Sequence, residues 1–286
     1  MHLKIYEDLM LYYQETLPFL LQKEAANNLQ ISISYHEKDN TKRAEDLFAT
    51  LVDEDETILM TISCTAPFHV LLGAGTRKVS AEMLRFVAAE IAKRGDKIPG
   101  VLAEKEMASC FAEVYAEKTK LERVVSMEER VYVLYTADMP KKTGEIRQAS
   151  EKDMYFLPYW LTEMHHDFRG KALPLAQQIK EATMLLQQEN LFLLTDEGMP
   201  VCMAGFARET PNGYSVNRVY TPPGFRGRGY ASCLVAALHK IARNRGKAFT
   251  TLFTNLANPV ANHVYQKIGY QAVTDYTEIR FVEPHV

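Results

Sequence analysis

The sequence predicts an α/β (α+β) fold in which a mixed, mostly antiparallel, twisted sheet is flanked by helices, with two tandem copies in the chain. Three observations lead to this prediction. The second half contains three consecutive strand-like runs, an amphipathic helical pattern follows them, and the first half repeats a similar order. We expect each helix to bury its apolar face on a sheet.

The strand-like runs of the second half lie at residues 191–195, 201–209 and 214–221. The connections between them, DEGMP and TPNG, contain the Gly, Pro and Asn residues that hairpin turns favour. The sequence therefore predicts a meander of antiparallel strands.

A helix is predicted after Gly229, where apolar residues recur at helical spacing until Gly246 supplies a stop. The run AFTTLF is typical of a short strand, and NPVANHVYQKIGY predicts a helix with Pro259 in its first turn. We expect YQAV and YTEIRFV to close the chain as a final strand pair.

The first half shows the same order. A strand at 68–75 enters a glycine loop, and helices are predicted at 80–95 and 110–118. The interval between the helix endings at Gly95 and Gly246 is nearly the same as the interval between the Val-Tyr pairs at 114–115 and 264–265. This spacing favours a duplication. Two unrelated α/β halves with similar helix endings are the alternative. A linker is predicted near TADMPKKTGE, residues 136–145.

The composition, 47% hydrophobic and 24% charged over 286 residues, is typical of a soluble globular protein. The amino-terminal stretch carries acidic residues between its apolar ones, unlike a signal peptide, and no apolar run approaches the roughly 18 residues of a membrane span. The four cysteines are scattered without metal-ligand spacing. We therefore expect a cytoplasmic protein with reduced thiols, no metal and no membrane partner.

Charge is unevenly distributed along the chain. The segment between Glu209 and Asp275 contains no acidic residue and eight basic ones, so it is +8 while the net charge of the whole chain is −3. The segment is expected to hold an anion. A solvated basic helix face is the alternative. A nucleic-acid partner is not expected, because the sequence pI of about 6.3 is not that of a typical nucleic-acid binder.

The sequence Arg226-Gly227-Arg228-Gly229 opens the helix predicted after residue 229. A helix amino terminus presents unpaired N–H groups and a positive dipole end, and glycines let a phosphate approach that backbone. Two nucleotide-binding motifs do not fit. The P-loop pattern is absent, and the dinucleotide pattern G-x-G-x-x-G has Ser232 in place of its third glycine.

The pattern that does fit is R-x-x-G-x-A, at residues 226–231. Here the sequence resembles the GNAT family of N-acetyltransferases, whose signature for the acetyl-CoA pyrophosphate is (Q/R)-x-x-G-x-(G/A). Residues 258–265 read N-x-x-A-x-x-x-Y and are followed by Gly269-Tyr270, similar to the second hallmark of that family. The resemblance implies a catalytic acetyltransferase domain at 143–286 and a degenerate copy at 1–142, which has Ala108 at the position of Asn258.

The resemblance also implies a role for each site residue. Val219, Tyr220 and Thr221 would pair with the pantetheine arm of acetyl-CoA, and the N–H near Val219 would polarise the thioester. Tyr265 would protonate the departing thiolate, and Asn258 would hydrogen-bond to pantetheine. The pyrophosphate would be bound by Arg226, Gly227, Arg228, Gly229, Tyr230, Ala231 and Ser232.

Each role has an alternative. Tyr265 could be a half-buried core residue, Asn258 could cap its helix, and Arg218 could serve only in an ion pair. Asn217 occupies a strand position where some relatives carry an acid. The candidates for a general base are Glu163, His165, His166 and Glu209.

The resemblance implies transfer of acetyl from acetyl-CoA to a primary amine of a small molecule or peptide by direct attack, in a monomer or homodimer. The acidic balance outside the basic segment favours a cationic acceptor. A CoA-binding sensor or scaffold without catalysis is the alternative function.

Overall fold

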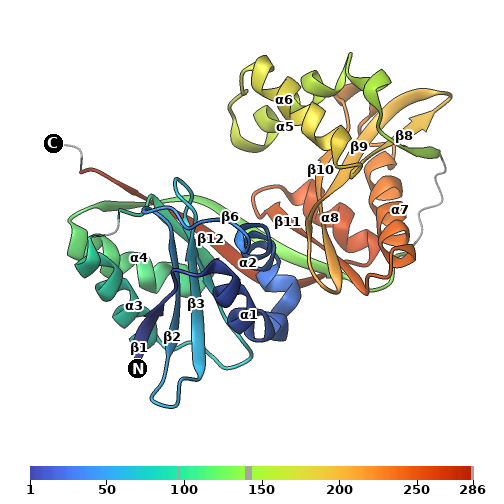
Figure 1. Ribbon diagram of the computed structural model, residues 1–286. Coiled ribbons are helices and arrows are strands. Elements are labelled where there is room, and N and C mark those ends of the chain that lie inside the picture. The colour runs from blue at the N-terminus through green and yellow to red at the C-terminus, as the bar shows by residue number, and fades with distance from the viewer. Residues whose placement is uncertain (96, 139–143, 285–286) are drawn as a thin grey trace. The chain divides into compact units, whose positions relative to one another are not determined.

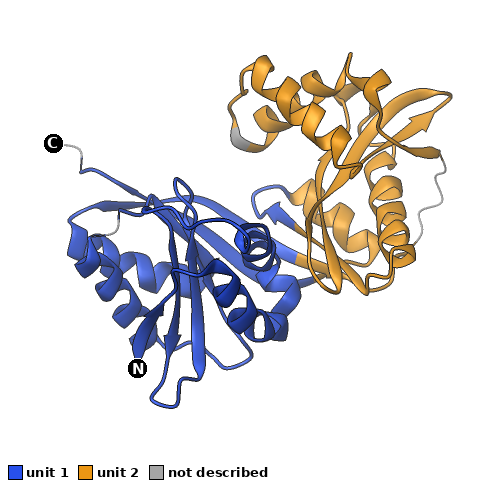
Figure 2. Cartoon of the chain, viewed as in Figure 1, with its two compact units in different colours: residues 1–131, 253–258, 272–286 blue, residues 132–252, 259–271 orange. Residues whose placement is uncertain are grey.

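The computed structural model describes residues 1–95, 97–138 and 144–284. Two compact units make up the chain. The first comprises residues 1–131, 253–258 and 272–286, and the second comprises 132–252 and 259–271 (Figure 2). The family resemblance implied a single boundary at 142/143. The core of the predicted linker, residues 139–143, lies outside the described residues.

The first unit contains a mostly antiparallel sheet in the order β1-β2-β3-β4-β5-β12-β6 (Figure 1). The strands β4 and β5 pair in parallel, and β5 pairs antiparallel with the carboxy-terminal strand β12. The strands are β1 (His2–Ile5), β2 (Leu47–Val52), β3 (Ile58–Cys64), β4 (Val70–Gly73), β5 (Gly100–Glu104), β12 (Gln271–Val282) and β6 (Glu122–Leu134), whose last residues belong to the second unit.

Helices pack on both faces of this sheet, and the alternation of side chains along β2 shows how. Leu47, Ala49 and Leu51 join the main core with α3 and α4, whereas Phe48 points to the other face and packs with Tyr12 of α1. The helices are α1 (Leu9–Leu20), α2 (Glu24–Glu37), α3 (Ala81–Arg94) and α4 (Lys105–Thr119), with the short 3₁₀ helix η1 (Leu21–Lys23).

The second unit has the same order of elements. Its strands run β6-β11-β10-β9-β8-β7, with β10 and β11 parallel and β7 to β10 antiparallel. The strands are β7 (Glu145–Gln148), β8 (Leu191–Asp196), β9 (Met199–Glu209), β10 (Gly213–Tyr220) and β11 (Phe249–Asn255), whose last three residues belong to the first unit. The helices are η2 (Glu151–Asp153), α5 (Leu157–Arg169), α6 (Leu175–Gln187), η3 (Pro223–Phe225), α7 (Tyr230–Asn244) and α8 (Pro259–Ile268).

The order of elements strengthens the case for duplication. In each unit an edge strand leads through two helices into three antiparallel strands, then a helix, a parallel strand and a second helix. The helices α3 and α7 start at Ala81 and Tyr230, and the strands β5 and β11 start at Gly100 and Phe249, so the same interval separates the two members of each pair. Assignment of the first unit as a degenerate acetyltransferase copy stays a prediction.

Most of the predicted elements are present, and two predictions are wrong. The carboxy-terminal strand pair is one continuous strand, β12, because the segment between the two runs contains no turn-forming Gly or Pro and Asp275 pairs with Arg130 at 2.6 Å instead of turning the chain. The helix predicted at 110–118 begins earlier, at Lys105. Among the described residues, no helix combines the length and the apolar character needed to cross a bilayer.

The division into units predicts how the halves behave when they are separated. A fragment of residues 143–286 carries β12 without β5, so Ile279 and Phe281 lose the core of the first unit. We expect this fragment alone to aggregate or to melt roughly 10 °C or more below the full chain, because exposed apolar strands associate. Co-expression with residues 1–142 should restore a soluble complex, which size-exclusion chromatography would detect. A monomeric 143–286 fragment as stable as the full chain would contradict this division.

Candidate active site

The parallel strands β10 and β11 pair only at their beginnings. Gly213, Tyr214 and Ser215 are in register with Phe249, Thr250 and Thr251. In the part of the chain that the structure describes, no further β10–β11 pair follows, although β10 continues to Tyr220. One edge of β10 is thus available for an added strand where it leaves β11.

A bulge in β10 lies in this unpaired stretch. Between two paired positions, β10 advances by three residues, from Asn217 to Tyr220, whereas β9 advances by two, from Gly205 to Met203. Arg218 takes up the extra residue with φ of 52°, a left-handed conformation that is unfavourable for a side chain of this size. The bulge turns Val219 toward the core beside α7, and Tyr220 toward the core beneath α5 and α6.

The loop after β10 is anchored at its start. The hydroxyl of Thr221 donates to Sγ of Cys202 at 3.3 Å, and the backbone N–H of Arg226 donates to the carbonyl of Pro223 at 3.2 Å. Burial raises the pKa of the Cys202 thiol to about 12, so this sulfur is a neutral packing group near pH 7.

Two glycines form the junction between this loop and α7. Gly227 and Gly229 have φ of 75° and 82°, and a Cβ at either position would meet nothing within 4 Å. Their backbone conformation therefore requires glycine, and the space beside them is open. The first helical turn that follows, from Tyr230 to Ser232, has no side-chain N-cap at Gly229. Helix geometry leaves the first N–H groups of α7 without intrahelical acceptors.

The two arginines of the loop differ in their contacts. The guanidinium of Arg226 donates to the carbonyl of Thr221 at 2.9 Å and to Asp167 of α5 at 2.6 Å, so it fastens the loop to α5. Arg228 is exposed and lies 5.9 Å from the ring centre of Phe225. Among the described residues Arg228 makes no ion pair, so it is the arginine whose charge remains uncompensated by a protein carboxylate.

Tyr265 of α8 is 9% exposed and packs between Tyr132 and Tyr270. In the described part of the chain, its hydroxyl makes no hydrogen bond. Burial, with a smaller contribution from the nearby Cys202, raises the pKa of Tyr265. The phenol therefore keeps its proton throughout the physiological pH range, as a general acid must.

Asn258 directly precedes α8 in the sequence and is exposed, and its backbone N–H donates to the carbonyl of Asn255 at 3.0 Å. It belongs to the first compact unit, whereas residues 219–232 and Tyr265 belong to the second. The structure thus brings all the predicted site residues except Asn258 into one unit. The role of Asn258 in binding pantetheine stays a prediction.

The candidates for a general base fall into two groups. Glu209 pairs with Tyr214 near the start of β10 and forms an ion pair of 2.7 Å with Lys247, so it lies at the opposite end of the strand from the glycine loop. His165 of α5 instead lies 3.7 Å from Glu181 of α6. Glu163 and His166 are also on α5, and their roles stay predictions.

Glu181 is the polar residue that sequence reasoning missed. Its Oε1 accepts a hydrogen bond of 3.0 Å from Nε of Arg218, and this ion pair confirms the alternative reading of Arg218 as a salt-bridge partner. The available signal was weak. Apolar residues at helical spacing in 175–187 predict a helix, but they do not reveal which strand Glu181 faces.

The corresponding loop of the first unit is filled by its own side chains. Oε1 of Gln22 accepts the N–H of Thr76 at 3.0 Å, and a Cβ on Gly75 would lie 2.5 Å from that same oxygen. The helix α3 has a side-chain cap, since Oγ of Ser80 accepts the N–H of Met83 at 3.2 Å. This junction therefore offers fewer free donors to an anion than the junction at α7.

Tyr115 of the first unit, which the sequence spacing paired with Tyr265, is buried and hydrogen-bonded within the fold. Tyr115 is 2% exposed, and its hydroxyl accepts the N–H of Ile98 at 3.4 Å. Ala108, which the sequence spacing matched with Asn258, lies inside α4 and is fully buried in the core, whereas Asn258 precedes α8. These contacts suit a packing role for the first unit.

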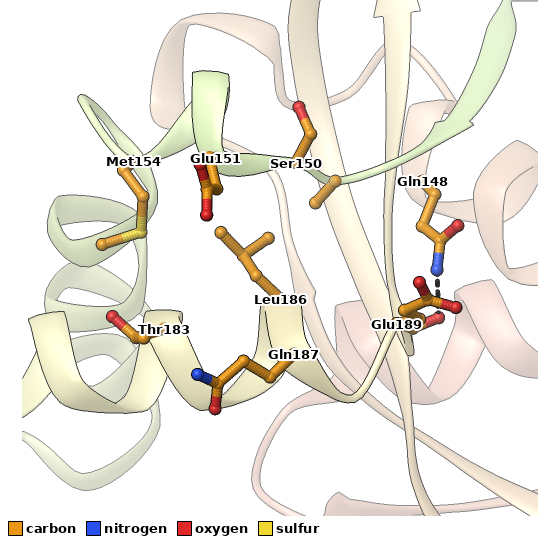
Figure 3. Close-up of a pocket in the computed structure, with 9 residues that line it drawn as sticks. Gln148, Ser150, Glu151, Met154, Thr183, Leu186, Gln187 and Glu189 are labelled. Atoms are coloured by element: carbon orange, nitrogen blue, oxygen red, sulfur yellow. Dashed lines mark hydrogen bonds between the residues drawn. The ribbon is translucent and has the colours of Figure 1, made fainter.

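A separate hollow of about 660 Å³ lies between the segment after β7 and the end of α6 (Figure 3). Among its lining side chains, Gln148 donates to the carbonyl of Glu189 at 2.6 Å. None of the predicted site residues lines this hollow. Among the described residues, no group of three or more His, Cys, Asp or Glu side chains is arranged to bind a metal ion.

Comparison with known proteins agrees with this geometry. Residues 149–270 match the model of the acetyltransferase (GNAT) family. This segment of the chain is therefore a GNAT acetyltransferase domain, and its general chemistry is acyl transfer. No curated protein matches the chain.

Solved structures share the fold along nearly the whole chain. A GCN5-related N-acetyltransferase from Sphaerobacter thermophilus is 12% identical with a TM-score of 0.62, and the match covers 99% of this chain and 97% of that one. A GNAT-family acetyltransferase from Colwellia psychrerythraea is 10% identical with a TM-score of 0.59, covering 99% and 100%. A GCN5-related N-acetyltransferase from Kribbella flavida is 12% identical with a TM-score of 0.55, covering 93% and 96%. These likenesses show the mixed α/β architecture expected from the sequence.

Proposed function

We propose that the protein transfers acetyl from acetyl-CoA to a primary amine by direct attack of the amine on the thioester. The observation that carries the proposal is the divergence of β10 from β11 next to an uncapped helix that begins with glycine. An unpaired strand edge suits an extended pantetheine arm, and the helix amino terminus suits the diphosphate.

In this proposal the backbone of Val219, Tyr220 and Thr221 pairs with pantetheine. An N–H near Val219 polarises the thioester carbonyl, since a fixed donor aimed at the developing oxyanion stabilises the tetrahedral intermediate. The amides from Gly227 to Ser232, with the charge of Arg228, bind the diphosphate. Arg226 positions the loop through Asp167.

Tyr265 then donates its proton to the CoA thiolate as the thioester bond breaks. A thiolate whose conjugate thiol has an ordinary pKa near 8.5 is a weaker base than a phenolate, so this proton transfer is favourable only where the site stabilises the products. Direct attack is favoured over an acetyl-cysteine intermediate because Cys202 is a buried, neutral thiol.

The acceptor is proposed to be a cationic small molecule or peptide amine, attracted by the acidic balance outside the basic segment. The first unit is proposed to be a degenerate copy that binds no cofactor, because Gln22 and Ser80 occupy its donors.

The first test compares two glycines at opposite ends of α7. Gly229→Glu places a bulky anion where the diphosphate is proposed to bind. Gly246→Glu places the same side chain at the other end, where φ is 84° and the space is equally open. Acetyl-CoA at about 100 times its dissociation constant should stabilise the parent by roughly 2.7 kcal/mol, or about 5 °C in melting temperature. We expect this shift to persist in Gly246→Glu and to vanish in Gly229→Glu.

Loss of the shift in both variants would indicate a general defect of α7. A full shift in Gly229→Glu would contradict the proposed diphosphate site.

The second test separates catalysis from binding at Tyr265. Tyr265→Phe removes the proton donor and keeps the ring, so we expect kcat to fall by about 10²-fold while acetyl-CoA affinity stays within about threefold. Tyr115→Phe, the same change at a buried tyrosine of the first unit, should leave both quantities unchanged. CoA release and calorimetry measure the two effects. A sensor that binds CoA without catalysis would show no turnover in the parent, and an unchanged kcat in Tyr265→Phe would remove this residue from the mechanism.

A further inference from the structure

A polar cluster of four side chains lies where α5 and α6 meet the bulge of β10. Oε1 of Glu181 accepts from Nε of Arg218 at 3.0 Å, and Oε2 of the same carboxylate lies 3.7 Å from Nε2 of His165. Nη1 of Arg218 donates to Oδ1 of Asn217 at 3.1 Å. The side chains of Glu181, Arg218 and His165 are 19%, 18% and 28% exposed, so the cluster is partly accessible to solvent.

The bulge brings this cluster next to the proposed reaction centre. Arg218 is the residue with φ of 52°, and it directly precedes Val219, whose N–H is proposed to face the thioester. Arg218, which binds the carboxylate of Glu181, is therefore adjacent to Val219, the strand position at which the amine is proposed to attack. The two oxygens of this carboxylate have separate partners, because Arg218 uses Oε1 and leaves Oε2 on the side of His165.

A second observation concerns a buried amide on α6, the helix that carries Glu181. Gln178 lies one helical turn before Glu181 and on the same face. Its side chain is fully buried, and neither Nε2 nor Oε1 has a hydrogen-bond partner among the described residues. Buried amides in proteins are nearly always paired, so an unpaired one requires an explanation.

The first unit provides the contrast. Gln30, on the buried face of α2, has all its partners within the fold: Nε2 donates to Tyr12 and Ser63, and Oε1 accepts from Thr61 at 2.9 Å. The unit with a closed glycine loop thus has a satisfied glutamine, and the unit with an open loop has an unsatisfied one.

We propose that Glu181 is the group that accepts the proton of the attacking amine, with Arg218 as its positioning residue and His165 as the outlet to solvent. The amine arrives as an ammonium ion, and its proton passes to Oε2 of Glu181 and then through Nε2 of His165 to water, which frees the nitrogen lone pair. The nitrogen then forms the C–N bond as the C–S bond breaks. The CoA thiolate takes its proton from Tyr265, and the second proton lost by the nitrogen restores the Tyr265 phenol. This inference rests on the proposed acetyltransferase function.

The test uses the full-length chain, acetyl-CoA and three probe amines: spermidine, tobramycin and a peptide with a free amino end. CoA release is measured from pH 6.5 to 9.5 with the probe that the parent uses fastest. We expect Glu181→Gln to lower kcat by about 100-fold at pH 7, and Glu181→Asp, which keeps the carboxylate, to remain within about tenfold of the parent. The control Glu189→Gln removes the same charge from the exposed residue after α6 and should leave kcat unchanged.

A pH-dependent rescue distinguishes proton transfer from a structural defect. The unprotonated fraction of an amine rises about tenfold per pH unit up to its pKa, which is about 10 for an alkylamine and about 8 for a peptide amino terminus, and an amine that arrives neutral has no ammonium proton for Glu181 to remove. The defect of Glu181→Gln should therefore shrink to about tenfold or less by pH 9.5. A defect that is constant with pH, or a kcat within about threefold of the parent at pH 7, would overturn the role of Glu181.

The binding of acetyl-CoA separates failure of this inference from failure of the proposed function. A parent whose melting temperature does not respond to acetyl-CoA would refute the function itself. A parent that binds acetyl-CoA but acetylates none of the three probes would contradict the proton-acceptor role while leaving the cofactor site intact.

Discussion

The divergence of two parallel strands is the constraint on which the rest of the site depends. Three residues of β10 pair with β11, and the remainder of β10 follows its other neighbour, β9, through a bulge at Arg218. Backbone polar groups in a sheet require partners, so an open strand edge is costly unless solvent or a ligand satisfies it. After β10 diverges from β11, the chain continues to the start of α7, where Gly227 and Gly229 leave further N–H groups accessible. A single run of backbone thus offers donors to both ends of an extended, anionic cofactor.

The two units share one order of elements, and the proposed function assigns ligand binding to the second and packing to the first. The first unit closes its loop with Gln22, caps α3 with Ser80, and satisfies Gln30 with neighbouring hydroxyl groups. In the second unit α7 has no side-chain cap, the space beside Gly227 and Gly229 is open, and the amide of Gln178 is unpaired among the described residues. These differences involve a few hydrogen bonds outside the apolar cores, so both units can keep one topology while only the second is proposed to bind the cofactor.

Sequence patterns predicted the elements best where periodicity was strong. The helix after Gly229 and the meander before it were predicted because apolar spacing and turn residues are local signals. The glycine loop was found for the same reason. The grouping of residues 253–258 and 272–286 with the first half was not predicted, because pairing between strands far apart in the chain, such as β5 and β12, leaves no local trace. Glu181 was missed because its partner, Arg218, lies on another element.

Hydrogen–deuterium exchange with and without acetyl-CoA tests the central claim most directly, because it reports on the backbone amides themselves. If the free edge of β10 and the start of α7 hold the cofactor, exchange should slow in peptides covering residues 216–221 and 227–232 and stay unchanged in peptides covering 73–78 of the first unit. Protection confined to the first unit, or no protection of residues 216–221 despite binding measured by calorimetry, would contradict the account.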